Sequence, residues 1–124
     1  MCTPVLLQND PLIISNRQFV SRLMLGTGKY KNFQEAQDAI MLSGCEILTV
    51  AIRRAQSSTV DGIDKLLNNL DWTKIWLMPN TAGCQTSEQA IRLAFLGREL
   101  LKNLNYVDNN FLKLEVIPDP KYLL

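Results

Sequence analysis

Four short apolar runs recur along this chain, and the segments between them have the hydrophobic spacing of amphipathic helices. The runs cover residues 22–25, 46–52, 75–78 and 111–117. Strands that alternate with helices predict a parallel sheet joined by right-handed crossovers. The strands are apolar almost throughout, which is typical of a parallel sheet covered on both faces. The expected fold class is therefore α/β, in one domain that spans residues 1–124.

Local signals place the first elements. Residues 12–15 and 18–20 predict a β-hairpin with Asn16-Arg17 as its two-residue turn. Asn32 can cap a helix with Glu35 three residues later, a variant of the capping box, and Gly44 is a typical helix terminator.

Further helices are expected later in the chain. The stretch 55–62 predicts a polar loop, and the apolar stripe that follows it predicts an amphipathic helix; its members are Ile63, Leu66, Leu67 and Leu70. Thr86 and Gln89 form another capping box before a third helix with Leu93 and Leu101 on one face.

Charge and residue usage exclude several classes of function. The net charge is +1, from 13 basic and 12 acidic residues, so no basic surface for nucleic acid is expected. No apolar run approaches the roughly 18 residues that span a membrane, and no secretory signal is recognised at the N-terminus. Histidine is absent, which removes the commonest metal ligand and the usual general base. No metal and no cofactor are expected.

The cysteines Cys2, Cys45 and Cys84 are far apart and form no CxxC pair. Free thiols in a reducing compartment are the favoured interpretation. A reactive cysteine is the weaker alternative, because the chain offers no histidine partner.

The last apolar run carries the most unusual polar pair. On a strand, residues two apart share a face, so Lys113 and Glu115 would lie together with Phe111 and Ile117. If that face is buried, both charges must be paired, neutralised or used in chemistry. If it is exposed, the pair is simply solvated.

The polar residues follow the ends of the strands. They comprise Gly26-Thr27-Gly28, Arg53-Arg54, Asn80 to Gly83 and the Lys113/Glu115 pair. A dinucleotide fingerprint fails because Lys31 stands where a third glycine would be needed. In a (β/α)8 barrel, functional groups lie at the C-terminal ends of the strands. A TIM barrel is therefore the better fit, with only the hairpin and about the first four βα units present.

Four blocks of residues carry a family resemblance. They are Ser21 to Tyr30, Thr49 to Arg54, Pro79 to Cys84 and Lys113 to Ile117. In this order and spacing they closely resemble thiazole synthase of thiamine biosynthesis. The family's chains are about twice as long, so the resemblance is to an N-terminal half that is truncated at its C-terminus. The resemblance implies that phosphate-binding loops and a further catalytic aspartate belong to the other half.

The resemblance also implies a chemistry. The family joins 1-deoxy-D-xylulose 5-phosphate, dehydroglycine and sulfur from the C-terminal thiocarboxylate of a small ubiquitin-like carrier protein. By position, Lys113 forms the Schiff base with the ketose and Glu115 is the acid/base residue. A homo-oligomer is implied for the full-length protein. An amine attacks a ketone only when neutral, and burial in a barrel lowers the pKa of a lysine by up to about 3–5 units.

Three further residues are predicted to bind substrate. Asn80 and Thr81 follow a strand and could meet substrate oxygens, although a turn that enters a helix favours the same residue types. Arg53 is expected on one face with Thr49 and Ala51, where its guanidinium suits a phosphate or carboxylate. Pairing with an acidic residue or a subunit contact is the alternative for Arg53.

Two other functions remain open. Another class I aldolase-like Schiff-base barrel would explain Lys113 but not the other blocks. A non-catalytic fragment that binds the carrier protein or a full-length partner would explain the short chain. The expected compartment is the cytoplasm, with the plastid stroma as the alternative.

Overall fold

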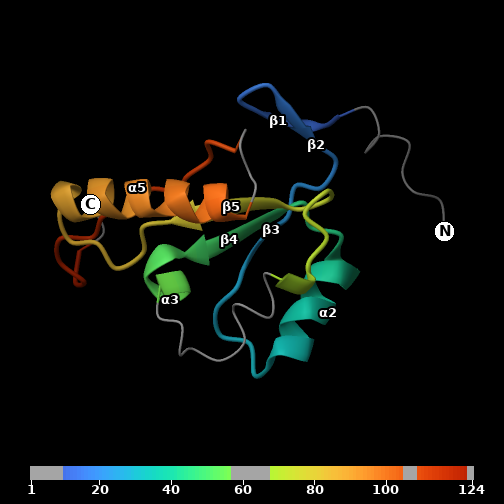
Figure 1. Ribbon diagram of the computed structural model, residues 1–124, viewed down its shortest axis with the longest axis horizontal. Coiled ribbons are helices and arrows are strands. Elements are labelled where there is room, and N and C mark those ends of the chain that lie inside the picture. The colour runs from blue at the N-terminus through green and yellow to red at the C-terminus, as the bar shows by residue number, and fades with distance from the viewer. Residues whose placement is uncertain (1–9, 57–67, 105–108, 123–124) are drawn as a thin grey trace.

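The computed structural model of the chain describes residues 10–56, 68–104 and 109–122 (Figure 1). In chain order, its elements are β1 (Leu12–Ile14), β2 (Arg17–Phe19), β3 (Met24–Gly26), α2 (Phe33–Ser43), β4 (Ile47–Ala51), α3 (Ile52–Gln56), β5 (Trp76–Asn80) and α5 (Ser87–Asn103). Strands β3 to β5 lie side by side, and α5 runs along β5. No helix in these ranges is both long and apolar enough to cross a bilayer.

Strands β3, β4 and β5 form a parallel sheet, in that spatial order. Gly26 pairs with Thr49, and Ala51 pairs with Asn80. Strands that neighbour each other in the chain are therefore neighbours in the sheet, and their C-terminal ends lie at one edge. The α/β class and the parallel pairing predicted from the sequence are confirmed.

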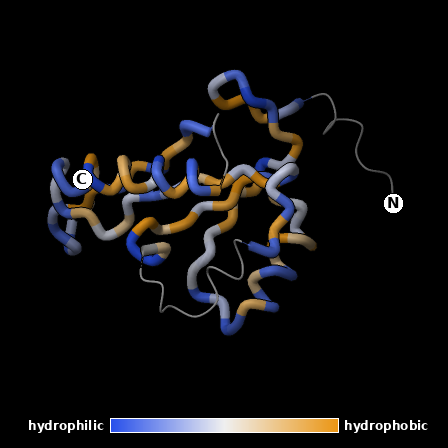
Figure 2. Tube along the Cα trace, viewed as in Figure 1, coloured by the Kyte–Doolittle hydropathy of each residue, from blue (hydrophilic) through white to orange (hydrophobic). Residues whose placement is uncertain are grey.

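The main core lies on one face of this sheet. Leu48, Val50 and Leu77 are fully buried and pack with Ile40 of α2 and Leu101 of α5. Figure 2 shows β4, the central strand of the sheet, as hydrophobic along most of its length. Because alternate strand residues share a face, both helices cover the same side of the sheet.

Among the described residues, the opposite face has its apolar cover near the start of the strands. Ile47 and Trp76 pack there against Phe19 of the hairpin, with Phe111 beside them. Farther along, Thr49 and other residues of this face are only half-buried. The sequence suggested cover on both faces, but the described residues provide complete cover on one.

The hairpin is present, but its turn lies one residue earlier than predicted. Ile14 pairs with Arg17, so Ser15 and Asn16 form the two-residue loop. Both have positive φ, 47° and 67°, as a type I′ turn requires, and this turn matches the twist of the strands. Arg17 is therefore a strand residue, and its guanidinium carbon lies 3.7 Å from the centre of the Trp76 ring.

The predicted helix caps are confirmed, with one difference. Asn32 Oδ1 accepts from the Glu35 N–H at 2.8 Å, and Gly44 ends α2 with φ 67°. The Glu35 carboxylate, however, accepts from the N–H of Lys31 and not from that of Asn32. The N–H of Gln89 donates to Thr86 in the same way at the start of α5.

Between β4 and β5 the prediction is partly wrong and partly untested. Residues 55–56 belong to α3 and not to a polar loop. The rest of that loop, and Ile63, Leu66 and Leu67 of the predicted helix, lie outside the described residues. Leu70 is described, and it is buried in the main core.

The fourth strand expected over residues 111–117 is reduced to one parallel bridge between Asn80 and Lys113. The Lys113 N–H donates to Pro79 O at 2.9 Å, and the Thr81 N–H donates to Lys113 O at 3.2 Å. After Thr81 the backbone that follows β5 turns, with Gly83 at φ 88°. Residues 111–117 do have an apolar alternation. A hydrogen-bonded ladder also needs an extended backbone beside them, and β5 provides none after Asn80, where it ends.

A close approach joins α5 to the sheet at Gly97. A Cβ at this position would lie 2.8 Å from Ile52 Cδ1 and 3.2 Å from Pro79 Cβ. Both neighbours are buried, so the helix can lie this near to β5 only because residue 97 has no side chain.

We therefore expect Gly97→Val to lower the free energy of unfolding by about 1–3 kcal/mol through overpacking. Urea unfolding monitored by circular dichroism measures this loss. Arg92→Val, on the exposed side of α5, is the control for placing a β-branched residue in the helix. Equal losses in the two variants would contradict the close approach.

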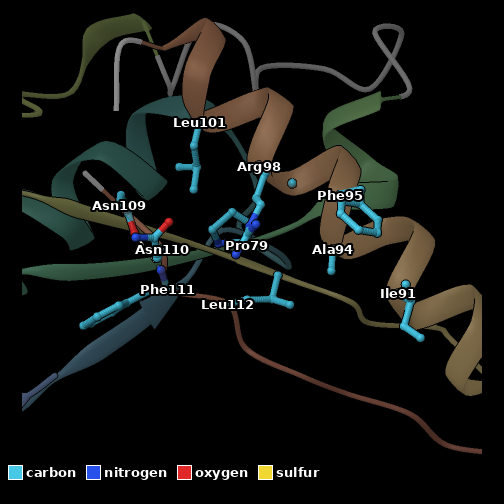
Figure 3. Close-up of a pocket in the computed structure, with 11 residues that line it drawn as sticks. Pro79, Ile91, Ala94, Phe95, Arg98, Leu101, Asn109, Asn110, Phe111 and Leu112 are labelled. Atoms are coloured by element: carbon cyan, nitrogen blue, oxygen red, sulfur yellow. Dashed lines mark hydrogen bonds between the residues drawn. The ribbon is translucent and has the colours of Figure 1, made fainter. Parts of the chain in front are cut away.

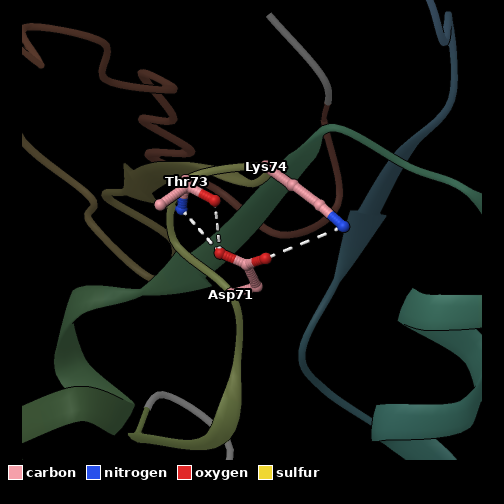
Figure 4. Close-up of polar contacts among 3 residues, drawn as sticks. All are labelled: Asp71, Thr73 and Lys74. Carbon is pink, nitrogen blue, oxygen red and sulfur yellow. Dashed lines mark hydrogen bonds and ion pairs between the residues drawn. The ribbon is translucent and has the colours of Figure 1, made fainter.

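A polar turn leads into β5 (Figure 4). Asp71 Oδ1 accepts from the Thr73 hydroxyl at 2.5 Å and from the Thr73 N–H at 3.0 Å. Lys74 Nζ lies 3.9 Å from the other carboxylate oxygen. The two Thr73 hydrogen bonds, with a smaller contribution from Lys74, lower the pKa of Asp71.

A lowered pKa means that ionised Asp71 stabilises the folded chain above the ordinary aspartate value of 3.8, and that this contribution is lost as the pH falls. The wild type should therefore exceed Asp71→Asn in stability most clearly near pH 6. The difference should shrink toward pH 2–3. Urea unfolding across this range measures it, and a difference that stays constant with pH would contradict the prediction.

Candidate active site

The polar residues predicted to be functional meet at the C-terminal edge of the sheet. Asn80 is the last residue of β5, and it pairs with Ala51 on one side and bridges Lys113 on the other. Thr81 follows directly, and Glu115 lies beside it through two hydrogen bonds. The structure thus brings together Asn80, Thr81, Lys113 and Glu115, from segments more than thirty residues apart in the chain.

Asn80 is buried, and its side chain joins two neighbouring segments. Its Nδ2 donates to Thr49 Oγ1 at 2.8 Å, and its Oδ1 accepts from the Ala82 N–H at 3.1 Å. The first bond ties the end of β5 to β4, and the second shapes the turn after the strand. This arrangement holds one amide at the strand ends in a single orientation.

Thr49 is the site residue that sequence reasoning missed. Its hydroxyl accepts from Asn80, and its backbone carbonyl accepts from the Thr27 hydroxyl at 3.3 Å. The signal available in the sequence was a polar residue inside the apolar strand 47–51. It was ambiguous, because threonine is common in strands for its branched shape alone.

Thr81 is fully buried, and its hydroxyl is occupied by the backbone of Glu115. Its Oγ1 donates to Glu115 O and accepts from the Glu115 N–H, both at 2.8 Å. A hydroxyl used in this way positions the neighbouring segment.

Arg53 does not share an extended face with Thr49 and Ala51, because α3 begins at Ile52 and ends the alternation. Its guanidinium still lies at the strand ends. A Cβ on Gly83 would be 3.1 Å from Arg53 Nη1, so Arg53 lies against the loop after β5. Arg54 lies closer still to Gly28, in the loop after β3, because a Cβ on Gly28 would be 2.5 Å from Arg54 Nη1.

Lys113 is exposed and Glu115 is half-buried. The burial expected for Lys113 in a barrel interior is thus not provided by the described residues. A hollow of about 580 Å³ lies on the face of β5 that carries the Asn80 side chain, nearer to the hairpin. Trp76, Met78 and Phe111 are among the residues that line it. Lys113 does not line this hollow.

A second hollow lies on the other side of β5, between α5 and residues 109–112 (Figure 3). It has a volume of about 260 Å³, and Phe95 and Ile91 of α5 are exposed at its wall. Neither Lys113 nor Glu115 lines it. This second hollow is separate from the polar cluster at the strand ends.

Two cysteines are described, and both are free and buried, namely Cys45 and Cys84. Burial raises the pKa of the Cys45 thiol, opposed in part by its hydrogen bond to Ser43, and Glu46 raises it further. An activated nucleophile needs the opposite shift. The environment of Cys45 therefore does not favour the reactive-cysteine alternative.

The family described as "Thiazole biosynthesis protein ThiG" matches residues 13–124. This range includes the hairpin except for its first residue, Leu12, together with the sheet and the polar cluster at the strand ends. The chain belongs to this family.

Curated relatives agree. The chain is 69% identical to the thiazole synthase of Emiliania huxleyi over 115 residues, which are 93% of this chain and 42% of that protein. It is 60% identical to the thiazole synthase of Thermosynechococcus vestitus over 119 residues, 96% of this chain and 43% of the relative. It also matches the bifunctional protein ThiO/ThiG of Nostoc at 61% identity, over 94% of this chain and 18% of the relative. The chain thus spans about two fifths of the length of these thiazole synthases.

The Thr49–Asn80 bond has a testable energetic consequence. Thr49→Val keeps the branched shape but leaves Asn80 Nδ2 without this acceptor, so we expect a loss of about 1–2 kcal/mol in the free energy of unfolding. Thr49→Ser keeps the hydroxyl and should recover most of the loss attributable to the hydrogen bond. Chemical denaturation of both variants measures the difference, and equal stabilities would contradict the assigned role.

Proposed function

We propose that this chain carries the imine-forming part of a thiazole synthase. In this proposal, 1-deoxy-D-xylulose 5-phosphate, dehydroglycine and carrier-bound sulfur are joined to a thiazole phosphate carboxylate. Family membership supports the reaction class. The observation that carries the residue assignment is the Asn80–Lys113 bridge, which holds a lysine level with the C-terminal end of a parallel strand.

We also propose that the sheet is part of a (β/α)8 barrel. Strands β3, β4 and β5 are parallel and adjacent in chain order, and α2 and α5 contribute to one core on one face. A doubly wound sheet would reverse its strand order and place helices on both faces. The remaining strands would correspond to the part of the relatives that this chain does not match.

The proposed chemistry begins at Lys113. Its neutral amine adds to the ketone carbon, and loss of water with uptake of one proton from solvent leaves an iminium whose positive charge acidifies the adjacent C–H bond. Glu115, two residues along the same segment, accepts that proton; the C–H electron pair then forms a C=C bond while the C=N π pair returns to nitrogen, which gives an enamine. A positioned acid/base of this kind typically contributes about 10²–10⁴-fold to the rate. The reaction class fits a lysine and a carboxylate at one strand end.

Asn80 and Arg53 are proposed to contact substrate. The Asn80 amide has a second N–H besides the one given to Thr49, and it lies next to Lys113. The guanidinium of Arg53, beside Gly83, suits a phosphate or carboxylate through paired hydrogen bonds. Thr81, the third residue predicted to bind substrate, stays a prediction; its hydroxyl already bonds to both backbone groups of Glu115.

The partners and the compartment belong to the same proposal. A small ubiquitin-like sulfur carrier with a C-terminal thiocarboxylate would deliver sulfur, and the full-length protein would be a homo-oligomer. Algal relatives such as those from Emiliania huxleyi and Porphyra purpurea support the plastid stroma over the cytoplasm as the compartment.

The test is reductive trapping. The folded chain is incubated with 1-deoxy-D-xylulose 5-phosphate and borohydride, and the intact mass and the modified peptide are read. We expect one adduct, on Lys113, which Lys113→Ala abolishes. Lys121→Arg, which removes another exposed lysine, is the matched control and should leave the adduct unchanged.

One alternative is favoured by a specific observation. Lys113 is exposed, and exposure fits a non-catalytic fragment that binds the carrier or a full-length partner. Such a fragment would give no adduct. A full-length thiazole synthase serves as the positive control for trapping. If that control is trapped and the folded chain is not, the imine-forming function of this chain is refuted and the binding alternative is retained. An aldolase-like barrel would instead form the adduct but show no dependence of turnover on a sulfur carrier.

A further inference from the structure

Four hydrogen bonds attach the segment that carries Lys113 and Glu115 to the end of β5. Two join backbone to backbone, and two join backbone to a side-chain hydroxyl. At Lys113, both backbone groups bond to the backbone of β5 and the residue after it, at 2.9 and 3.2 Å. At Glu115, both backbone groups bond to the Thr81 hydroxyl, at 2.8 Å each. The backbone groups of both residues thus face β5, as residues two apart do on an extended chain.

The hydroxyl replaces a backbone partner that the fold removes. A continued parallel ladder would present backbone groups of residues 81–83 to Glu115, but the chain turns away there. The Cys84 N–H bonds back to Thr81 O, and the Ala82 N–H bonds to the Asn80 side chain. Thr81 Oγ1 can both donate and accept, so this one atom satisfies the N–H and the C=O of Glu115.

This hydroxyl is completely buried, so water does not compete for it. Leu114, between the two attached residues, is 70% exposed. Among the described residues its backbone N–H and C=O have no hydrogen-bond partner. Without the Thr81 hydroxyl, the segment would therefore be held at Lys113 and next at Ile117, whose N–H donates to Cys84 O at 2.8 Å.

We propose that Thr81 is a positioning residue for the Lys113/Glu115 pair: its hydroxyl extends the β5 ladder past the end of the strand and keeps both side chains on one face. This inference rests on the proposed function, in which the lysine forms the imine and the carboxylate takes the neighbouring proton. Thr81 itself touches no reacting atom. Its contribution is the geometry between the two groups that do.

The experiment compares Thr81→Val, which keeps the shape and removes the hydroxyl, with Thr81→Ser, which keeps the hydroxyl. Thr86→Val is the matched control, because it deletes another threonine hydroxyl that bonds to backbone, at the start of α5. Two readouts are taken on the full chain. One is the rate of borohydride trapping at Lys113 with saturating ketose phosphate, and the other is amide hydrogen exchange at Glu115 relative to Leu114.

In the wild type and in Thr81→Ser, the Glu115 amide should exchange at least about tenfold more slowly than that of Leu114. The reason is that the Glu115 N–H must first break one hydrogen bond of ordinary strength, which the Leu114 N–H does not have. In Thr81→Val the two amides should exchange alike, and the rate of trapping should fall about tenfold while the ketose concentration for half-maximal rate stays the same. Thr86→Val should change neither readout. Rescue by serine separates positioning from a general loss of stability.

Two results would overturn the inference. One is a Thr81→Val chain that traps at the rate of Thr81→Ser. The other is a wild-type Glu115 amide that exchanges as fast as Leu114, a comparison that remains available if Thr81→Val does not fold. If the wild type forms no adduct, the proposed function of this chain fails, and the exchange of Glu115 in the two Thr81 variants alone decides whether the hydroxyl holds the segment.

Discussion

The parallel register across β4, β5 and residue 113 is the constraint on which the rest of this structure depends. It pairs Ala51 with Asn80 and Asn80 with Lys113, and it thereby decides which side chains meet at the C-terminal edge. Because side chains alternate between the faces of a strand, a shift of one residue would exchange the two faces. Leu77 would leave the core, and Asn80 would no longer face Thr49.

The packing of the helices on one face reinforces this register. Leu48, Val50 and Leu77 are completely buried beneath α2 and α5, and the absence of a side chain at Gly97 lets α5 approach Pro79 and Ile52. The opposite face carries no helix among the described residues. It is closed near the hairpin by Phe19, Trp76 and Phe111, and at its other end it carries the amide, the hydroxyl and the lysine.

Much of the fold and part of the site could be predicted from local patterns. The caps at Asn32 and Gly44 depend on neighbouring residues only, and both are present. The turn at Ser15 was misplaced because the tendencies of Asn16 and Arg17 were weighed without the pairing that sets the register. The strand over 111–117 was overextended because its pattern contained no information about where the partner β5 ends. The hydrogen bonds of the Thr81 hydroxyl could not be predicted from the sequence, because their partner is Glu115, 34 residues away.

By itself, the sequence determined the α/β class, the parallel order, both ends of α2, the start of α5 and the polar residues at the strand ends, because periodicity, capping and turn chemistry act over a few residues. Four ordered blocks also determined the resemblance to thiazole synthase. Only the tertiary structure decided that Thr49 holds Asn80, that Arg53 lies against Gly83, that Lys113 is exposed, and that one buried hydroxyl continues the ladder to Glu115. These facts depend on which distant backbone groups are left without partners when strands end and turn. Which distant groups become their hydrogen-bond partners is determined only when the strands are in register.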